Sequence, residues 1–143
     1  MTSKFRKLLS KVKNPFWKTG GELITEIMDG RNLVNGKQTF ELARTHKDDL
    51  PVMIKCCEAE IIKFKKTHLV PAPFYFERVA ILSRKNKNYK QEIDYCEKYI
   101  RFVDLYCKKN KTHENVGVKM GPRYKAIVNR LPKAKELYKQ QRS

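Results

Sequence analysis

The chain has 143 residues with a formal net charge of +17, and 41% of its residues are hydrophobic. This length suits a single domain with one core. No run of roughly 18 apolar residues is present to cross a membrane, and the N-terminus lacks the continuous apolar segment of a secretory signal. The four cysteines lie among apolar neighbours, so we expect a reduced, cytoplasmic protein with buried thiols.

Basic residues gather at both ends of the chain. Residues 1–18 carry six basic and no acidic side chains, and residues 103–143 carry eleven basic and three acidic ones. In contrast, residues 19–50 carry four basic and six acidic side chains. Such an imbalance attracts polyanions. It leaves open whether the partner is a nucleic acid, an anionic membrane or an acidic protein, and a lysine-rich soluble surface is a further alternative.

Residues 4–13 predict a short amphipathic helix with basic side chains around one apolar face. A helix of this kind lies on an anionic membrane or enters a partner's groove. A loosely docked arm is the alternative, because about ten residues form only a marginal helix in water. Trp17 either stacks on a base or a partner or packs against the helical domain and holds the N-terminal segment on it. We expect the second role. We therefore divide the chain into a basic arm, 1–18, and one helical domain, 19–143.

Helical spacing of apolar residues continues along the first part of this domain. The pattern predicts helices over residues 21–34, 37–47 and 50–66, with Gly30 placed to end the first. We expect Asp48 and Asp49 to cap the third helix. The apolar residues expected to be buried on the second and third helices are Phe40, Leu42, Ala43, Ile54, Cys57, Ile61, Ile62 and Phe64.

Residues 73–102 predict two further helices, joined by the polar turn at 85–88, which pack as an antiparallel hairpin. The second helix is expected to continue for about two turns and to enter a polar loop at 110–122. A last helical region begins at Arg123. Pro132 is expected to interrupt or kink it, and its apolar residues are expected to cover the open face of the hairpin.

A degenerate repeat links the two halves of the domain. The spacing Ile54-x-x-Cys57-Glu58-x-x-Ile61 recurs as Ile93-x-x-Cys96-Glu97-x-x-Ile100, at an offset of 39 residues. A fixed period in this range is typical of stacked helical hairpins.

Residues 73–102 also resemble a tetratricopeptide repeat (TPR), a two-helix unit that stacks into a superhelix. The matching residues are Phe76, Val79 and Ala80 on the first helix and Tyr89, Ile93 and Ile100 on the second. Glu92, Tyr99 and Asp104 depart from the family pattern, and residues 37–66 resemble it only weakly. The resemblance implies an all-α fold: antiparallel helical hairpins stacked as a short TPR-like array with a C-terminal capping helix.

The sequence contains no pattern typical of an enzyme. The glycines form no phosphate-binding loop, and the cysteines and histidines lack the spacing of a metal site. Cysteines on helices with apolar neighbours favour packing thiols over a nucleophile. We therefore predict a protein that is not an enzyme and that has no catalytic residues, no cofactor and no metal.

Interleaved aromatic and basic side chains on the second hairpin and the C-terminal region are the candidate binding residues. These residues are Tyr75, Arg78, Arg84, Glu92, Tyr99, Arg101, Lys119, Arg123 and Lys125. Glu92 is expected either to face a groove or to pair with Arg78 or Arg84. The prediction is an interaction module that binds an acidic protein segment. Nucleic-acid binding through phosphate contacts is the alternative, a membrane-peripheral role of the arm is a third hypothesis, and a homodimer is possible.

Overall fold

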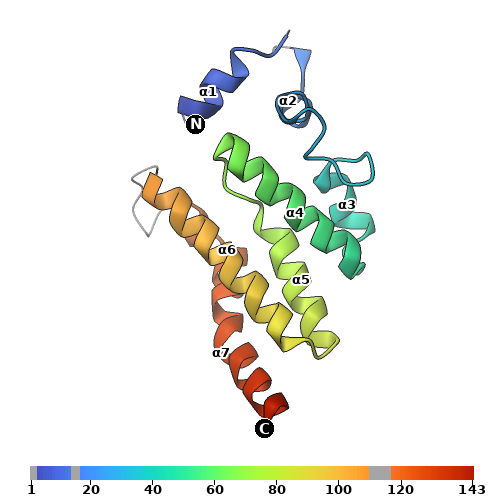
Figure 1. The fold of residues 1–143 in the computed structure, drawn as a ribbon, viewed down its shortest axis with the longest axis vertical. Coiled ribbons are helices and arrows are strands. Elements are labelled where there is room, and N and C mark those ends of the chain that lie inside the picture. Colours follow the sequence, from blue (N-terminus) through green and yellow to red (C-terminus); the bar gives the residue numbers. More distant parts are fainter. Residues whose placement is uncertain (1–2, 14–16, 110–116) are drawn as a thin grey trace.

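The computed structural model describes residues 3–13, 17–109 and 117–143, and most of these residues are helical. Figure 1 shows the chain running from α1 at one end to the C-terminus of α7 at the other. The helices are α1 (Ser3–Leu9), α2 (Gly20–Met28), α3 (Thr39–Thr45), α4 (Leu50–Thr67), α5 (Pro73–Lys85), α6 (Tyr89–Lys109), the 3-10 helix η2 (Gly117–Met120) and α7 (Pro122–Arg142). In the described part of the chain, no helix is long and apolar enough to cross a membrane.

The prediction of an all-helical chain is confirmed, and the helix boundaries follow local signals. Asp49 precedes α4 and its carboxylate accepts a hydrogen bond from the Val52 N–H, as expected of a helix cap. Proline occupies the first turn of α4, α5 and α7, where its missing N–H has no intrahelical partner. The expected polar loop at 110–122 lies partly outside the described residues, because 110–116 are not among them.

Helix α5 forms the centre of the core, since it packs against α4, α6 and α7. Phe76, Val79 and Ala80 of α5 are completely buried. The Phe76 ring lies 4.9 Å from the ring of Tyr99 on α6, centroid to centroid. From α7, Ile127 is also completely buried. The predicted packing of residues 73–102 as two helices is thus confirmed, and α7 covers both of them.

Of the two outcomes expected at Pro132, the interruption into two helices is wrong, because α7 continues through it, and the kink stays a prediction. Proline removes one backbone hydrogen bond and crowds the preceding turn. Here Pro132 is exposed, whereas Ile127 and Ala134 on either side of it are fully buried. Packing on both sides of the proline therefore holds the helix in one piece.

The predicted buried side of α3 and α4 is partly wrong. Phe40 is 66% exposed and Ile62 is 40% exposed. The buried residues of α4 are instead Met53, Cys56, Cys57, Ala59, Glu60, Phe64 and Thr67. Because α3 and α5 both pack on α4, its buried surface is wider than a single stripe and includes small and polar side chains.

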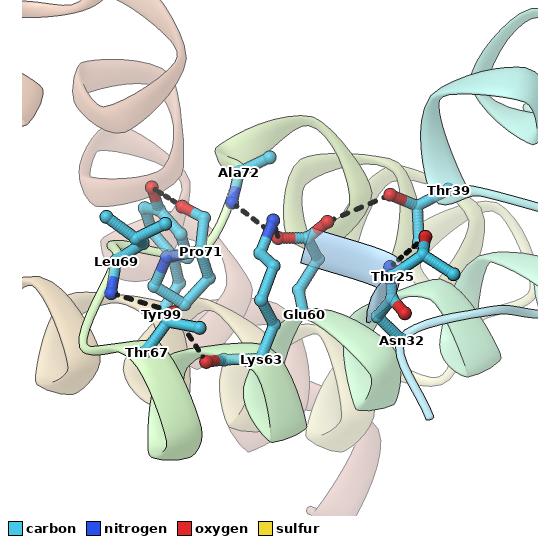
Figure 2. Close-up of polar contacts among 10 residues, drawn as sticks. All are labelled: Thr25, Asn32, Thr39, Glu60, Lys63, Thr67, Leu69, Pro71, Ala72 and Tyr99. Carbon is cyan, nitrogen blue, oxygen red and sulfur yellow. Dashed lines mark hydrogen bonds and ion pairs between the residues drawn. The ribbon is translucent and has the colours of Figure 1, made fainter. Parts of the chain in front are cut away.

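Glu60 connects three segments of the chain, and its side chain is only 3% exposed. Its carboxylate accepts hydrogen bonds from Thr39 Oγ1 at 2.9 Å and from the Ala72 N–H at 3.2 Å. Lys63 Nζ lies 2.8 Å from the same carboxylate. Figure 2 shows Glu60 between Thr39 of α3 and Ala72, the residue before α5. One buried carboxylate therefore holds α3 and the start of α5 on α4.

Tyr99 of α6 holds the segment that connects α4 and α5. Its hydroxyl donates a hydrogen bond of 2.7 Å to the Pro71 carbonyl oxygen (Figure 2). Burial raises the pKa of Tyr99 well above its usual value, so the hydroxyl stays protonated and remains a donor. The segment between α4 and α5 is thus hydrogen-bonded to Glu60 of α4 and to Tyr99 of α6.

Candidate functional site

A basic surface of the protein lies where three helix ends meet. Helices α4 and α6 run in the same direction, and α1 lies beside their C-terminal ends (Figure 1). Phe64 of α4 and Phe102 of α6 pack edge to face with ring centroids 5.2 Å apart, and α1 contacts α4 and buries its Phe5. We call this surface the basic end. Its members are Lys4, Lys65, Lys66, His68, Lys108 and Lys109.

His68 lies at the centre of the basic end. It follows the last residue of α4 with a left-handed backbone, φ 59°, and its Nδ1 lies 3.3 Å from Lys109 Nζ. Burial lowers the pKa of His68, and the charges of Lys109 and Lys4 lower that pKa further. The neutral imidazole can then accept a hydrogen bond from the ammonium at Nδ1 and keep its proton on Nε2.

The lysines of the basic end have no carboxylate partner among the described residues. Within the residues that the structure describes, the ion pairs include none of the six basic-end side chains. Elsewhere, the positive charge is partly neutralised by carboxylates. Examples are the pairs Arg78–Asp48, Lys119–Asp104, Arg123–Glu77 and Lys135–Glu97. Within the described residues, no ion pair therefore compensates the positive charge of the basic-end lysines.

Three of the predicted binding residues lie inside the protein. Tyr75 is 4% exposed, and Glu92 and Tyr99 are 0% exposed. Glu92 does not face a groove: its carboxylate binds Arg84 and Arg130, each at 2.9 Å. Of the two arginines expected as its partner, Arg84 is confirmed, whereas Arg78 pairs with Asp48. These buried residues support the fold of the hairpin.

The remaining predicted binding residues are spread over α6, η2 and α7. Arg101 and Lys125 are exposed. Lys119 lies 2.8 Å from Asp104, and the guanidinium of Arg123 lies over the Phe74 ring, 4.8 Å from its centroid. The structure therefore assigns two of these four to contacts within the protein and leaves two at the surface.

The sequence analysis missed His68 and the meeting of three helix ends. The basic pairs 65–66 and 108–109 were visible in the sequence, each near the C-terminal end of a predicted helix. Because α4 and α6 run in the same direction (Figure 1), these two ends lie on the same side of the molecule. The position of Lys4 has no such signal, because it depends on where α1 docks.

Trp17 was expected to anchor the arm, but its side chain is 87% exposed. The preceding residue, Phe16, lies outside the described residues. The arm instead docks through Phe5 of α1, which is buried. The lone tryptophan is thus an exception to the general tendency of large aromatic side chains to pack inside.

The four cysteines are buried and carry free thiols. Burial raises the pKa of Cys56 to about 11, with Glu60 adding to the rise. Burial also raises the pKa of Cys96 to about 12, with Glu92 adding to it. A nucleophilic thiol needs a lowered pKa, so the environment of both cysteines is that of packing residues. Within the described residues, no cluster of metal-binding side chains is found.

A cavity of about 300 Å³ lies next to Glu60, with walls from α2, α3, α4 and the start of α5. Its polar groups are already engaged: Glu60 is bonded as described, and Asn32 Nδ2 donates to Thr25 Oγ1 (Figure 2). Asn32 Oδ1 has no hydrogen-bond partner in the described structure, but it is closed to solvent. A ligand in the cavity would not reach it, so the basic end is the better candidate site.

Comparison with known proteins identifies no relative. No protein-family model matches the chain, and neither the curated proteins nor the solved structures contain a match to it.

Proposed function

We propose that this protein is a non-enzymatic interaction module, a TPR-like helical scaffold that binds an acidic segment of another protein. In this proposal, α3–α4 and α5–α6 are two consecutive hairpins, and α7 is the cap. The order of packing supports it, because α4 contacts α5, and α7 contacts both α5 and α6. The function rests on one observation, the meeting of uncompensated cations from three helix ends at the basic end.

An acidic protein segment fits this surface better than a nucleic acid does. The basic end is a small group of residues from the ends of α1, α4 and α6. A nucleic-acid backbone is usually gripped by a longer series of phosphate contacts. Three cations elsewhere on the protein, Arg78, Lys119 and Arg123, are paired with carboxylates and are less available to extend such a series. A short run of glutamates or aspartates can be bound by the few cations of the basic end alone.

The test compares two double charge reversals with the same net change. Lys65→Glu with Lys109→Glu alters the basic end, and Lys85→Glu with Lys139→Glu alters the opposite end of the molecule (Figure 1). All four lysines are exposed, so neither variant disturbs the core. Binding of a fluorescent decaglutamate peptide is measured by anisotropy. We expect the basic-end variant to weaken binding about tenfold or more, since each exposed charge pair contributes up to about 1 kcal/mol and reversal replaces attraction with repulsion.

The control variant is expected to bind within about twofold of the unaltered protein. An equal loss in both variants would show that net charge alone attracts the peptide and would contradict a site at the basic end. A single-stranded DNA of similar charge serves as the second probe. If the protein binds the DNA and not the peptide, with an affinity that falls steeply with salt, the nucleic-acid alternative replaces the proposal.

A further inference from the structure

The centre of the basic end is a group of three nitrogen donors from three different elements. Lys4 comes from α1, His68 follows α4, and Lys109 ends α6. The contact of 3.3 Å between Lys109 and His68 is direct, and Lys4 is close enough for its charge to act on the imidazole. The groups that face His68 are its ring neighbour Phe64 on α4 and these two lysines.

This arrangement contains donors and positive charge but no carboxylate. The charged groups that act on His68 are both cations, and the ion pairs of the described residues leave Lys4 and Lys109 uncompensated. Like charges held near one another destabilise the free protein, and an anion placed between them removes that repulsion. The ammonium of Lys109 occupies Nδ1 of His68, which leaves Nε2–H as the donor available to a ligand.

We infer that Lys4, His68 and Lys109 form a binding site for a phosphate group, carried by a phosphorylated side chain of the acidic partner. This inference rests on the proposed function and adds the chemical group that the basic end recognises. A phosphorylated side chain carries a charge of about −1.5 to −2 and three acceptor oxygens. His68 and Lys109, in contact at 3.3 Å, supply donors for those oxygens, and the nearby charge of Lys4 adds attraction, whereas a carboxylate offers two oxygens and one charge.

His68 also links the site to proton uptake. In the free protein, burial and the two lysines keep the pKa of His68 below its usual value. A bound dianion reverses the local field and favours the protonated imidazole. The pKa of His68 therefore rises on binding, and the complex takes up a proton at Nδ1, which ends the hydrogen bond from Lys109 and frees that ammonium to donate to the phosphate.

The experiment uses the full chain and two matched glutamate-rich peptides, one with a central phosphoserine and one with serine. We expect the phosphopeptide to bind about tenfold more tightly. The variant His68→Asn tests the site, because asparagine tolerates the left-handed backbone that residue 68 requires. Together with Lys109→Met, it is expected to reduce the phosphopeptide preference to about twofold or less while serine-peptide binding persists. Lys65→Met, outside the group, is expected to weaken both peptides equally and keep the preference.

A second readout follows the imidazole itself by NMR titration of the histidine ring protons. We expect the pKa of His68 to rise with the phosphopeptide and not with the serine peptide, whereas the signal of His46, in the α3–α4 connection, stays unchanged. Equal binding of the two peptides overturns the phosphate site and leaves the proposed function intact. Loss of preference in Lys65→Met, or an equal gain from aspartate in place of phosphoserine, also overturns it. Failure of both peptides to bind contradicts the proposed function instead.

Discussion

Replacing Glu92 with alanine is expected to destabilise the protein by about 3–5 kcal/mol, because it leaves two arginines of a buried ion pair without their carboxylate. Glu92 is fully buried. It accepts hydrogen bonds from Arg84 Nε at 3.0 Å and from Arg130 Nε at 2.9 Å. These contacts join α5, α6 and α7, so their loss weakens the whole core rather than one helix. Thermal unfolding followed by circular dichroism measures the change, and a fall of roughly 10 °C or more in Tm is expected.

Glu97→Ala is the matched control for this prediction. Glu97 lies on the same helix, with its side chain 43% exposed in a pair with Lys135. An exposed pair contributes about 1 kcal/mol or less. Similar losses in the two variants would contradict a special role of Glu92. Replacing Glu92, Arg84 and Arg130 together with leucine is expected to recover much of the stability, because no buried charge is then left unpaired.

Replacing Glu60 with alanine is the second large effect, with an expected loss of about 3 kcal/mol. The change leaves the half-buried Ala72 N–H and Thr39 hydroxyl without their carboxylate acceptor, and an unsatisfied donor costs up to about 1–3 kcal/mol, the upper part of this range applying to full burial. Lys63 also loses its partner. Because these groups hold α3 and the start of α5 on α4, hydrogen exchange is expected to accelerate first in α3.

The control is Glu58→Ala on the same helix, since Glu58 is exposed. This variant is expected to change the free energy of unfolding by no more than about 0.5 kcal/mol. Urea denaturation compares the two variants. Equal stability of Glu60→Ala and the unaltered protein would contradict the role of Glu60 as the link between α3, α4 and α5.

Helices with clear start signals could be predicted from the sequence. The helix expected at residues 50–66 is observed as Leu50–Thr67, because Asp49 and Pro51 mark its start. The hairpin of α5 and α6 followed from apolar spacing and a short polar turn. These signals are local, so a single sequence contains them.

Features that depend on distant parts of the chain could not be predicted in the same way. Glu92 is buried because Arg130, 38 residues later, reaches it, and spacing within α6 does not contain that information. Pro132 remains helical because of packing on both sides of it. Likewise, the basic end exists only when α1 docks beside α4 and α6. The candidate site therefore required the tertiary structure, whereas the helices that carry it did not.

The buried thiols have a practical consequence for studying this protein. Cys56 and Cys57 belong to α4, and Cys96 and Cys107 belong to α6. A thiol reagent reaches such residues only when the structure opens around them. Their labelling rates thus report the opening of the two helices that carry the basic end, without any engineered probe. Cys107 lies two residues before Lys109. The labelling rate of its thiol therefore reports whether ligand binding at the basic end stabilises the last turn of α6.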